Sequence, residues 1–290
     1  MTFAWAEERR HEYPVAALCR VLGVSRSGYY ARARRPPSAA ATRRDGLAAR
    51  IGEVHAEAKE RYGSPRVHAE LSARGVACCV NTVARVMRAN GIRAKASRRF
   101  ARTTDSRHGL PVAENVLARD FAPAAPDVAW AMDFTYVPTL EGWLFLAVVI
   151  DLFSRRIVGW AMSATMTSRL VVDALGMAVS RRGPAAGLVA HSDRGSQYAS
   201  DHYRSELGRL GATCSMSGVG QCWDNAVVES TFGQIKRELV HHERYATRDE
   251  ARASIFEYVE VFYNRVRRHS TLGYVSPAEY ERAHNPSHRP

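Results

Sequence analysis

Residues 223–239 have the sequence WDNAVVESTFGQIKREL, and the rest of the chain is interpreted relative to this run. Its apolar side chains recur at intervals of three and four residues, which predicts an amphipathic helix. They are Val228, Phe232, Ile235 and Leu239. Asn225, Glu229 and Lys236 follow nearly the same interval on a neighbouring stripe. The polar face is therefore expected to carry an amide, a carboxylate and an ammonium group above a buried apolar seam.

Two aspartates upstream of this helix are associated with strand-like runs. Asp133 lies in WAMDFTY at 130–136, where strand alternation places it on the opposite face from Trp130. Asp193 follows LVAHS at 188–192 and begins a polar loop that contains glycine. Sites on parallel sheets form at such strand ends. With 35 residues between Asp193 and Glu229, the three carboxylates are candidates for one shared site.

Three carboxylates in one site require positive charge between them. Two like charges ~4 Å apart repel by about 4 kcal/mol at an effective dielectric constant of about 20. Hard divalent cations remove that repulsion, and Mg²⁺ prefers carboxylate and phosphate oxygens. Two such ions, ~3.5–4 Å apart, activate a hydroxyl or water and stabilise the leaving oxygen of a phosphodiester. The carboxylates therefore predict metal-dependent chemistry on a nucleic-acid backbone.

Neighbouring polar residues have simpler interpretations. Asp151 ends a strand and is interpreted as a turn cap, with metal contact as the alternative. Asp224 is interpreted as the N-cap of the helix, with a fourth ligand position as the alternative. His191 is interpreted as structural, because two-metal chemistry needs no separate base. Lys236 and Asn225 are candidates to hold a DNA phosphate, the alternative being a solvated surface.

The composition is that of a globular protein with room for two or three domains. The chain has 290 residues, of which 46% are hydrophobic. Its longest apolar run, 143–150, is too short to span a bilayer, and its start lacks the pattern of a signal peptide. The five cysteines include no C-x-x-C pair, which argues against a zinc site and favours a reduced, cytoplasmic setting.

The positive charge is confined to the first part of the chain. Residues 1–125 carry 23 Lys and Arg against 11 Asp and Glu, whereas residues 126–290 carry 18 against 18. The whole net charge of +12 therefore precedes residue 126. This distribution predicts a DNA-binding N-terminal region joined to a neutral catalytic region. The alternative is a basic face that serves solubility only.

The first of two short helix-turn-helix patterns lies near the N-terminus. Residues 14–22 predict a helix, Gly23 a turn, and Ser25 the cap of a second helix that runs to Arg34. A linker is expected at 32–38, where two prolines stop the helix.

The second pattern follows after this linker. Residues 65–73 predict one helix, and Asn81 is expected to cap another that Gly91 ends. Arg85 and Arg88 take outward positions on that last helix, where basic side chains contact DNA in helix-turn-helix proteins. Protein–protein contact is the alternative role for both helical units. A basic tether is expected at 94–107.

The remainder of the chain predicts an α/β fold. Strands are expected at 128–137, 143–152 and 156–163, then helices at 168–181 and 201–210 alternating with strands at 188–192 and 212–216. Such an order gives a mixed sheet with helices on both faces, and the apolar run 143–150 suits a strand buried on both sides. Thr247 and Glu250 form a predicted capping box before a last apolar helix.

Four motifs, in this order, resemble the OrfB subunit of transposases of the insertion-sequence-three family, which has a retroviral-integrase-like core. They are W-x-M-D-F-T-Y at 130–136, H-S-D-R-G-S-Q-Y at 191–198, W-D-N-A-x-x-E-S at 223–230 and Y-N-x-x-R-x-H-S-x-L-G-Y-x-S-P-x-x-Y at 263–280. The resemblance covers nearly the whole chain. Thr231 departs from it, since the family often has a second Phe there, which puts local packing in doubt rather than chemistry.

This resemblance implies a ribonuclease-H-like, mixed-sheet catalytic core after an all-α region. It also implies that Asp133, Asp193 and Glu229 bind two Mg²⁺ or Mn²⁺ ions and that the chain cuts transposon ends and transfers the freed 3′-hydroxyl. The implied partners are the double-stranded DNA of the transposon ends and target, further copies of the chain, and a subunit from an upstream reading frame. No membrane partner is expected.

The expected domains are a short helix-turn-helix region at 1–37 and a second such domain with its basic linker at 44–107. They are followed by the catalytic core at 123–240 and a helical extension at 241–290. Two other functions stay open: a catalytically inactive DNA-binding regulator, and a nuclease of the ribonuclease-H type. The nuclease hypothesis accounts for the metal chemistry but not for the basic helical half.

Overall fold

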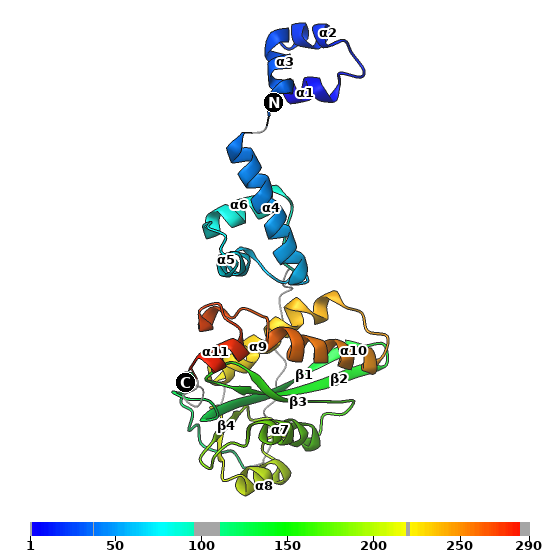
Figure 1. Cartoon of the computed structure of the whole chain (residues 1–290). Helices are drawn as coiled ribbons and strands as arrows, with labels where there is room; N and C mark the ends of the chain where they lie inside the picture. The colour runs from blue at the N-terminus through cyan, green and yellow to red at the C-terminus, as the bar shows by residue number, and fades with distance from the viewer. Residues whose placement is uncertain (1, 37, 96–110, 219–220, 285–290) are drawn as a thin grey trace.

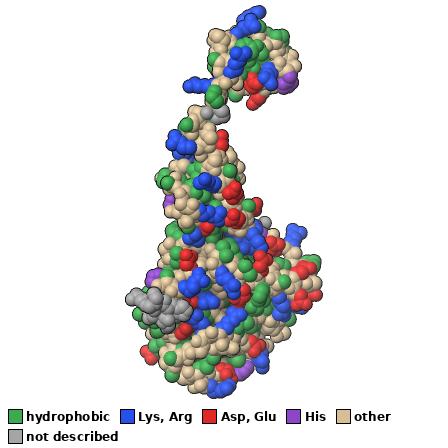
Figure 2. Space-filling view, viewed as in Figure 1, with side chains coloured by type: hydrophobic (Ala, Val, Ile, Leu, Met, Phe, Trp, Pro, Cys, Tyr) green, Lys and Arg blue, Asp and Glu red, His purple; other side chains and the backbone are tan. Residues whose placement is uncertain are grey.

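The computed structural model describes residues 2–36, 38–95, 111–218 and 221–284 (Figure 1). Two helical units precede a layered α/β core, with the chain running from the first unit to the core in sequence order. Lys and Arg side chains are visible on both helical units and across the face of the core beneath them (Figure 2). Within the described residues, no helix combines the length and the apolar character needed to cross a membrane.

The first helical unit is a small three-helix bundle. Its helices are α1 (Thr2–Glu8), α2 (Val15–Val21) and α3 (Arg26–Arg34). The Oγ of Ser25 accepts a hydrogen bond of 3.0 Å from the Gly28 amide, so the predicted cap of α3 is confirmed. Gly23 has a φ of +65°, which glycine adopts readily, so the predicted turn is confirmed as well. The core of the unit comprises Ala6, Leu18, Cys19 and Tyr29.

The second helical unit comprises α4 (Ala39–Glu57), α5 (Ser64–Ala73) and α6 (Val80–Ala89). The start of α4 lies ahead of residue 44, because Ser38 caps the helix by accepting a hydrogen bond from the Ala41 amide. The prediction that Asn81 caps α6 was wrong: Cys79 takes the extended N-cap conformation. Gly91, with a φ of +68°, follows the C-cap residue of α6 as predicted. Most of the expected basic tether lies outside the described residues.

The core contains a five-stranded mixed sheet in the order β3-β2-β1-β4-β5. The antiparallel strands are β1 (Ala129–Thr139), β2 (Gly142–Asp151) and β3 (Ile157–Ser163). Strands β4 (Val189–Ser192) and β5 (Thr213–Met216) continue the sheet from β1 in parallel. All five strands match the predicted ones to within a few residues. The expected full burial of β2 holds only in part, because Trp143 at its start is 50% exposed.

Helices cover both faces of the sheet, because each strand alternates its side chains between two apolar layers. Helices α7 (Ser168–Arg182) and α8 (Asp201–Arg209) pack on the face that carries Trp130 and Met132. Helices α9 (Ala226–Glu238) and α10 (Arg248–Phe256) pack on the face that carries Ala131 and Val148. The capping box between Thr247 and Glu250 at the start of α10 is confirmed.

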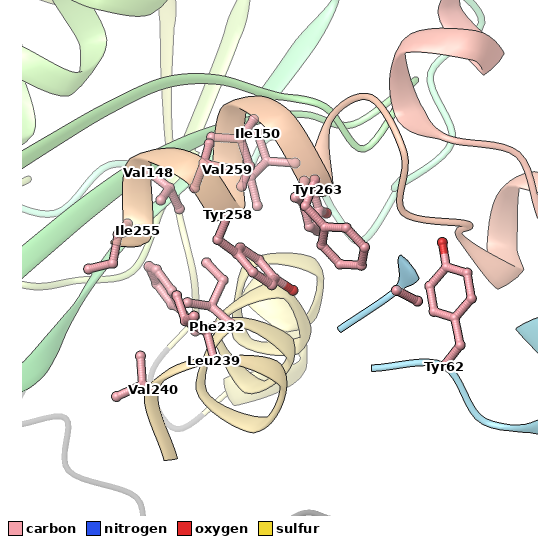
Figure 3. Close-up of a cluster of buried hydrophobic side chains, with 14 of the residues drawn as sticks. Tyr62, Val148, Ile150, Phe232, Leu239, Val240, Ile255, Tyr258, Val259 and Tyr263 are labelled. Carbon is pink, nitrogen blue, oxygen red and sulfur yellow. The ribbon is translucent and has the colours of Figure 1, made fainter. Parts of the chain in front are cut away.

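The end of the chain folds back over the α9 face. A π-helical turn, Glu257–Tyr263, follows α10, and α11 (Pro277–His284) is the last helix described. Short 3₁₀ turns lie at Cys222–Asn225, Val240–His242 and Ser270–Leu272. Figure 3 shows Phe232 of α9 and Tyr258 of the π-helical turn packed together. Tyr62 of the second helical unit belongs to the same apolar cluster, and its ring centre lies 6.1 Å from that of Phe262. The second helical unit therefore shares a hydrophobic core with the α/β half.

Candidate active site

The three predicted catalytic carboxylates come from three different elements. Asp133 lies within β1, Asp193 directly follows β4, and Glu229 lies in the first turn of α9. Parallel pairing of Met132 with Ser192 makes Asp133 and Asp193 the next residues on adjacent strands. Helix α9 packs along β1, and the charge of Glu229 acts on Asp133. The sheet and its covering helix thus gather residues that are up to 96 positions apart in the sequence.

The electrostatics of Asp133 show that these carboxylates influence one another. Burial holds the pKa of Asp133 well above its ordinary value, and the charge of Asp193 raises it further. The charge of Glu229 also raises this pKa, whereas Lys236 opposes the rise. Asp133 is therefore surrounded by more negative than positive charge, an arrangement that favours the binding of a cation.

Backbone amides orient both aspartates. Asp133 Oδ1 accepts a 2.7 Å hydrogen bond from the Phe134 amide, and Asp193 Oδ1 accepts one of 2.9 Å from the Gly195 amide. A Cβ at position 195 would lie 3.0 Å from Asp193 Oδ1 and 3.2 Å from Gln197 Oε1. A side chain at this position would thus crowd the carboxylate, so Gly195 permits the tight turn that carries Asp193.

The described residues do not form a finished metal cage. No group of three or more His, Cys, Asp and Glu side chains among them is close enough to hold an ion. Glu229 is exposed, and the effect of its charge on Asp133 is smaller than that of Asp193. The donor chemistry nevertheless suits a hard cation, because Mg²⁺ binds through one or two carboxylates and completes its shell with water and substrate phosphate.

Lys236 lies inside this site rather than on a solvated surface. It is 6% exposed, and its Nζ lies 4.7 Å from the centre of the Tyr136 ring. Burial lowers the pKa of Lys236, whereas the charge of Asp133 raises it. The structure therefore brings one ammonium group to the carboxylates, and its contact with a DNA phosphate stays a prediction.

Asn225 ties helix α9 to strand β1. Its side chain is buried, and Nδ2 donates a 3.2 Å hydrogen bond to the Met132 carbonyl oxygen. Because Met132 precedes Asp133, this bond fixes the start of α9 against the strand that carries the first carboxylate. The structure gives Asn225 a positioning role, and its predicted contact with DNA remains untested.

Asp224 does not cap α9 as predicted, since Asn225 occupies the N-cap position. Its buried carboxylate instead accepts hydrogen bonds from the Gly218 amide at 2.8 Å, Asn115 Nδ2 at 2.9 Å and Arg119 Nε at 2.7 Å. Burial alone would raise the pKa of Asp224, but the Gly218 amide and Arg119 more than offset that effect and hold it below its ordinary value. Sequence reasoning missed Asn115 and Arg119, because no local pattern links them to residue 224.

Two other polar residues have structural roles, as interpreted. Asp151 is fully buried and accepts hydrogen bonds from Ser154 Oγ at 2.6 Å and from the Ser154 and Asp127 amides. His191 is buried, and its Nδ1 lies 2.9 Å from Ser215 Oγ. Burial lowers the pKa of His191 to about 4, so the imidazole is neutral at physiological pH.

The predicted DNA-binding arginines lie in the other half of the molecule. Arg85 and Arg88 are both exposed on α6, the second helix of the helix-turn-helix pattern in the α4–α6 unit. The apolar side chains Val83, Val86 and Met87 of the same helix are buried against α4 and α5. Helix α6 is thus amphipathic, and it directs its basic side chains to solvent, where DNA could reach them.

Family models match the chain over most of its length. An HTH-like domain matches residues 42–100, and integrase core domains match residues 123–222 and 229–284. Together with the five-stranded mixed sheet, the integrase core confirms the predicted ribonuclease-H-like fold. A chain of the simian T-cell lymphotropic virus intasome is similar at 15% identity and a TM-score of 0.48, covering 83% of this chain and 76% of that one. This likeness is too loose to carry an argument.

Two curated relatives are much more similar in sequence. A protein of insertion element IS600 from Shigella sonnei, described as an uncharacterized 31 kDa protein, is 45% identical over 263 residues, which cover 91% of this chain and 97% of that protein. Transposase InsF for insertion sequence IS3A from Escherichia coli K12 is 44% identical over 283 residues, which cover 97% and 98%. With these relatives, an HTH-like domain and an integrase core, the chain belongs to the IS3 family of DNA transposases.

Proposed function

We propose that this transposase cuts transposon ends and joins the freed 3′-hydroxyl to a new phosphodiester at Asp133, Asp193 and Glu229. The observation that carries the proposal is the convergence of three elements: parallel pairing places Asp133 beside Asp193, and α9 packs on β1. The charges of Asp193 and Glu229 both raise the pKa of Asp133, after burial, which agrees with this arrangement. Like charges gathered in one place oppose folding, and such local conflicts are expected where function requires them.

Two Mg²⁺ or Mn²⁺ ions are the proposed cofactors, held by these three carboxylates. Since the described side chains form no complete cage, we expect substrate phosphate oxygens to complete the ligand set. When bound, such ions neutralise charge that develops on the scissile phosphate and activate the attacking oxygen. The carboxylates of Asp133 and Asp193 are already oriented for this role by the Phe134 and Gly195 amides.

The residues around the carboxylates supply positioning. Asn225 holds α9 against β1 and so fixes the distance between Glu229 and Asp133. The ammonium group of Lys236, beside Asp133, would bind a phosphate of the incoming DNA end and keep it in the site after the first cut. A retained 3′-hydroxyl can then attack the target phosphate in line, whereas a water molecule in its place gives hydrolysis only.

The DNA partner is proposed to bind first to the helical half of the chain. Arg85 and Arg88 on α6 are the proposed contacts to the transposon end, within the expected 44–107 domain. The other proposed domains are the helix-turn-helix region at 1–37, the catalytic core at 123–240 and the helical extension at 241–290. We further propose that the chain self-associates and that a subunit from the upstream reading frame completes the active assembly. The assembly is proposed to act in the bacterial cytoplasm, where its DNA lies.

The test is a gel assay with a labelled duplex that carries the terminal repeat of the insertion element encoding this chain, called the element-end duplex below. Target DNA, Mg²⁺ and the upstream-frame subunit are included. A joined product that appears in one step with inversion at phosphorus is the expected result. Nicked DNA without joined product at any protein or metal concentration would contradict the transposase proposal and support the nuclease alternative. DNA binding without any cut would support the inactive regulator.

A further inference from the structure

A second cluster of charged side chains lies at the opposite end of the catalytic helix. Glu238 is the last residue of α9 and lies nine residues after Glu229, which corresponds to about 13 Å along the helix axis. Its side chain is buried at 7% exposure. No step of the proposed reaction uses this carboxylate, so its burial needs another explanation.

Glu238 is surrounded by donors from two parts of the molecule. Arg267, itself only 1% exposed, donates from Nη2 to Oε1 at 2.7 Å and from Nε to Oε2 at 2.9 Å. Tyr258 donates its hydroxyl to Oε2 at 2.8 Å. Arg66 of α5 approaches Oε1 with Nη1 at 3.4 Å. The first two donors follow α9 in the core, whereas Arg66 belongs to the second helical unit.

Further contacts join the same two parts around Glu238. Arg66 Nε donates to the Arg268 carbonyl oxygen at 2.9 Å, and Arg268 Nε donates to Glu70 Oε2 at 2.7 Å. The Tyr62 hydroxyl donates to the Val266 carbonyl oxygen at 3.1 Å and accepts from the Arg268 amide at 2.9 Å. The Tyr62 ring lies at the edge of the shared apolar cluster (Figure 3).

Helix α5 therefore contacts two neighbours at once. Val67 and Leu71 pack against the buried residues of α6. Arg66 and Glu70 form ion pairs with Glu238 and Arg268 of the α/β half. Since α6 carries the exposed arginines, a continuous set of packed and hydrogen-bonded side chains runs from α6 through α5 to Glu238 and then along α9 to Glu229. Energetic coupling between sites travels through such contiguous contacts.

We propose that the Glu238 cluster, which comprises Glu238, Arg267, Arg66 and Tyr62, is a docking joint that sets the register between DNA held by α6 and the catalytic carboxylates. The joint determines which phosphodiester reaches Asp133, Asp193 and Glu229. Arg66 and Tyr62 are positioning residues in this scheme, because they touch neither substrate nor metal. The inference rests on the proposed function.

The experiment uses the full chain and the element-end duplex labelled at one end, with cut positions resolved to single nucleotides. Arg66→Met removes the joint's charged contact from the helical unit but leaves the Glu238–Arg267 pair intact. We expect the DNA affinity to stay unchanged. The ratio of cuts at the wild-type phosphodiester to cuts at neighbouring positions should fall about tenfold, which is the scale of one charge-assisted hydrogen bond. Arg66→Lys should restore part of that fraction.

Two further variants separate positioning from general destabilisation. Arg43→Met is the control, since Arg43 is an exposed arginine of the same unit whose Nε donates to the Ala39 carbonyl oxygen within α4. It should leave the cut position unchanged. Tyr62→Phe keeps the ring and removes only the two hydrogen bonds to 266 and 268, so it decides the question if Arg66→Met fails to fold.

The outcomes also separate this inference from the proposed function. A wild-type chain that makes no cut, with its partner subunit and Mg²⁺ present, overturns the proposed function. A wild-type chain that cuts at one position, together with Arg66→Met or Tyr62→Phe variants that cut at that position with the same sharpness, overturns the docking joint. Loss of stability with an unchanged cut position has the same consequence.

Discussion

Carboxylates near the two ends of helix α9 are in opposite electrostatic states. Near its N-terminal end, the partly buried Asp133 lies close to Asp193 and Glu229. Its pKa is raised by desolvation first and then by those two charges, while Lys236 opposes the rise. At its C-terminal end, Glu238 is buried among Arg267, Arg66 and the Tyr258 hydroxyl. Burial alone would raise the pKa of Glu238, but the arginines more than offset it and hold that pKa below its ordinary value.

This difference separates a site where carboxylates outnumber the ammonium group of Lys236 around Asp133 from one where a carboxylate is paired with arginine. A paired carboxylate gains nothing from a cation and contributes to the native packing, whereas a carboxylate that faces others of its sign gains when a cation arrives. The same helix therefore joins a reactive end to a structural end. Substitutions at the two ends should have opposite effects on activity and stability.

The largest effect is expected from removing a charge at the reactive end. Asp133→Asn, Asp193→Asn and Glu229→Gln should each reduce cleavage of the element-end duplex by about a thousandfold or more, since metal-bound carboxylates supply several kcal/mol of charge stabilisation. DNA binding should persist, because α6 is unchanged. Cleavage rates and binding isotherms measured on the same preparations check both statements.

Stability provides the control for that prediction. In buffer without divalent ions, Asp133→Asn should not lower the free energy of unfolding, because it removes a charge that its neighbours repel. Added Mg²⁺ should raise the melting temperature of the wild type and not that of the variant. A substituted carboxylate that leaves cleavage near the wild-type rate does not belong to the site.

At the structural end, Glu238→Ala should instead destabilise the fold. It leaves the buried guanidinium of Arg267 without its partner, which costs about 3–5 kcal/mol of unfolding free energy. Urea denaturation measures this loss. Glu206→Ala, which breaks an ion pair with the exposed Arg209, is the control, and it should cost about 0–1 kcal/mol. Equal losses for the two variants would contradict the contrast between the ends of α9.

Lys236→Ala tests the ammonium group beside Asp133 at the reactive end. We expect joining to fall about tenfold more than first-strand nicking, because the ammonium would retain the cut DNA end through a charge-assisted contact. Arg237→Ala removes an exposed cation from the same turn of α9 and serves as the control. If nicking and joining fall together, Lys236 supports the carboxylates and not the DNA end.

Changes at the exposed arginines of α6 should affect binding alone. The double variant Arg85→Ala and Arg88→Ala should reduce the slope of log affinity against log salt by about 0.9 for each DNA phosphate that the protein no longer neutralises. Arg169→Ala on α7, where the side chain is 75% exposed, is the control and should leave the slope unchanged. A double variant with the wild-type slope would place the DNA-binding surface elsewhere.

The smallest effect is a pH dependence at the structural end. The folded pKa of Glu238 lies below its ordinary 4.5, so its stabilising contribution is complete above about pH 4.5 and is lost as the pH falls through the folded value. Glu238→Gln removes this dependence. The stability difference between wild type and variant, measured by urea denaturation at several pH values, should therefore shrink in acid. A constant difference would mean that Glu238 is not ionised in the fold.

Much of this molecule could be predicted from local patterns. Alternation located the five strands and the face of Asp133, helical spacing located α9, and glycines with positive φ marked the turns after α2 and α6. These features depend on residues within one or two turns of each other, so the sequence displays them directly. The candidate carboxylates were also identified this way, because alternation gave the face of Asp133 within its strand, while Asp193 follows a strand and Glu229 lies in the first turn of a helix.

The tertiary structure alone decided how the polar residues are used. Asp224 contacts Asn115 and Arg119 rather than capping its own helix, and Asn225 bonds the strand that carries Asp133. Glu238 and Arg66 are 172 residues apart, and no spacing rule joins them. Periodicity shows which face of an element is apolar, but not which distant element will cover it. A polar side chain at that contact takes its role from whichever donors and acceptors the packing brings, because a buried charge without a partner is too costly to keep.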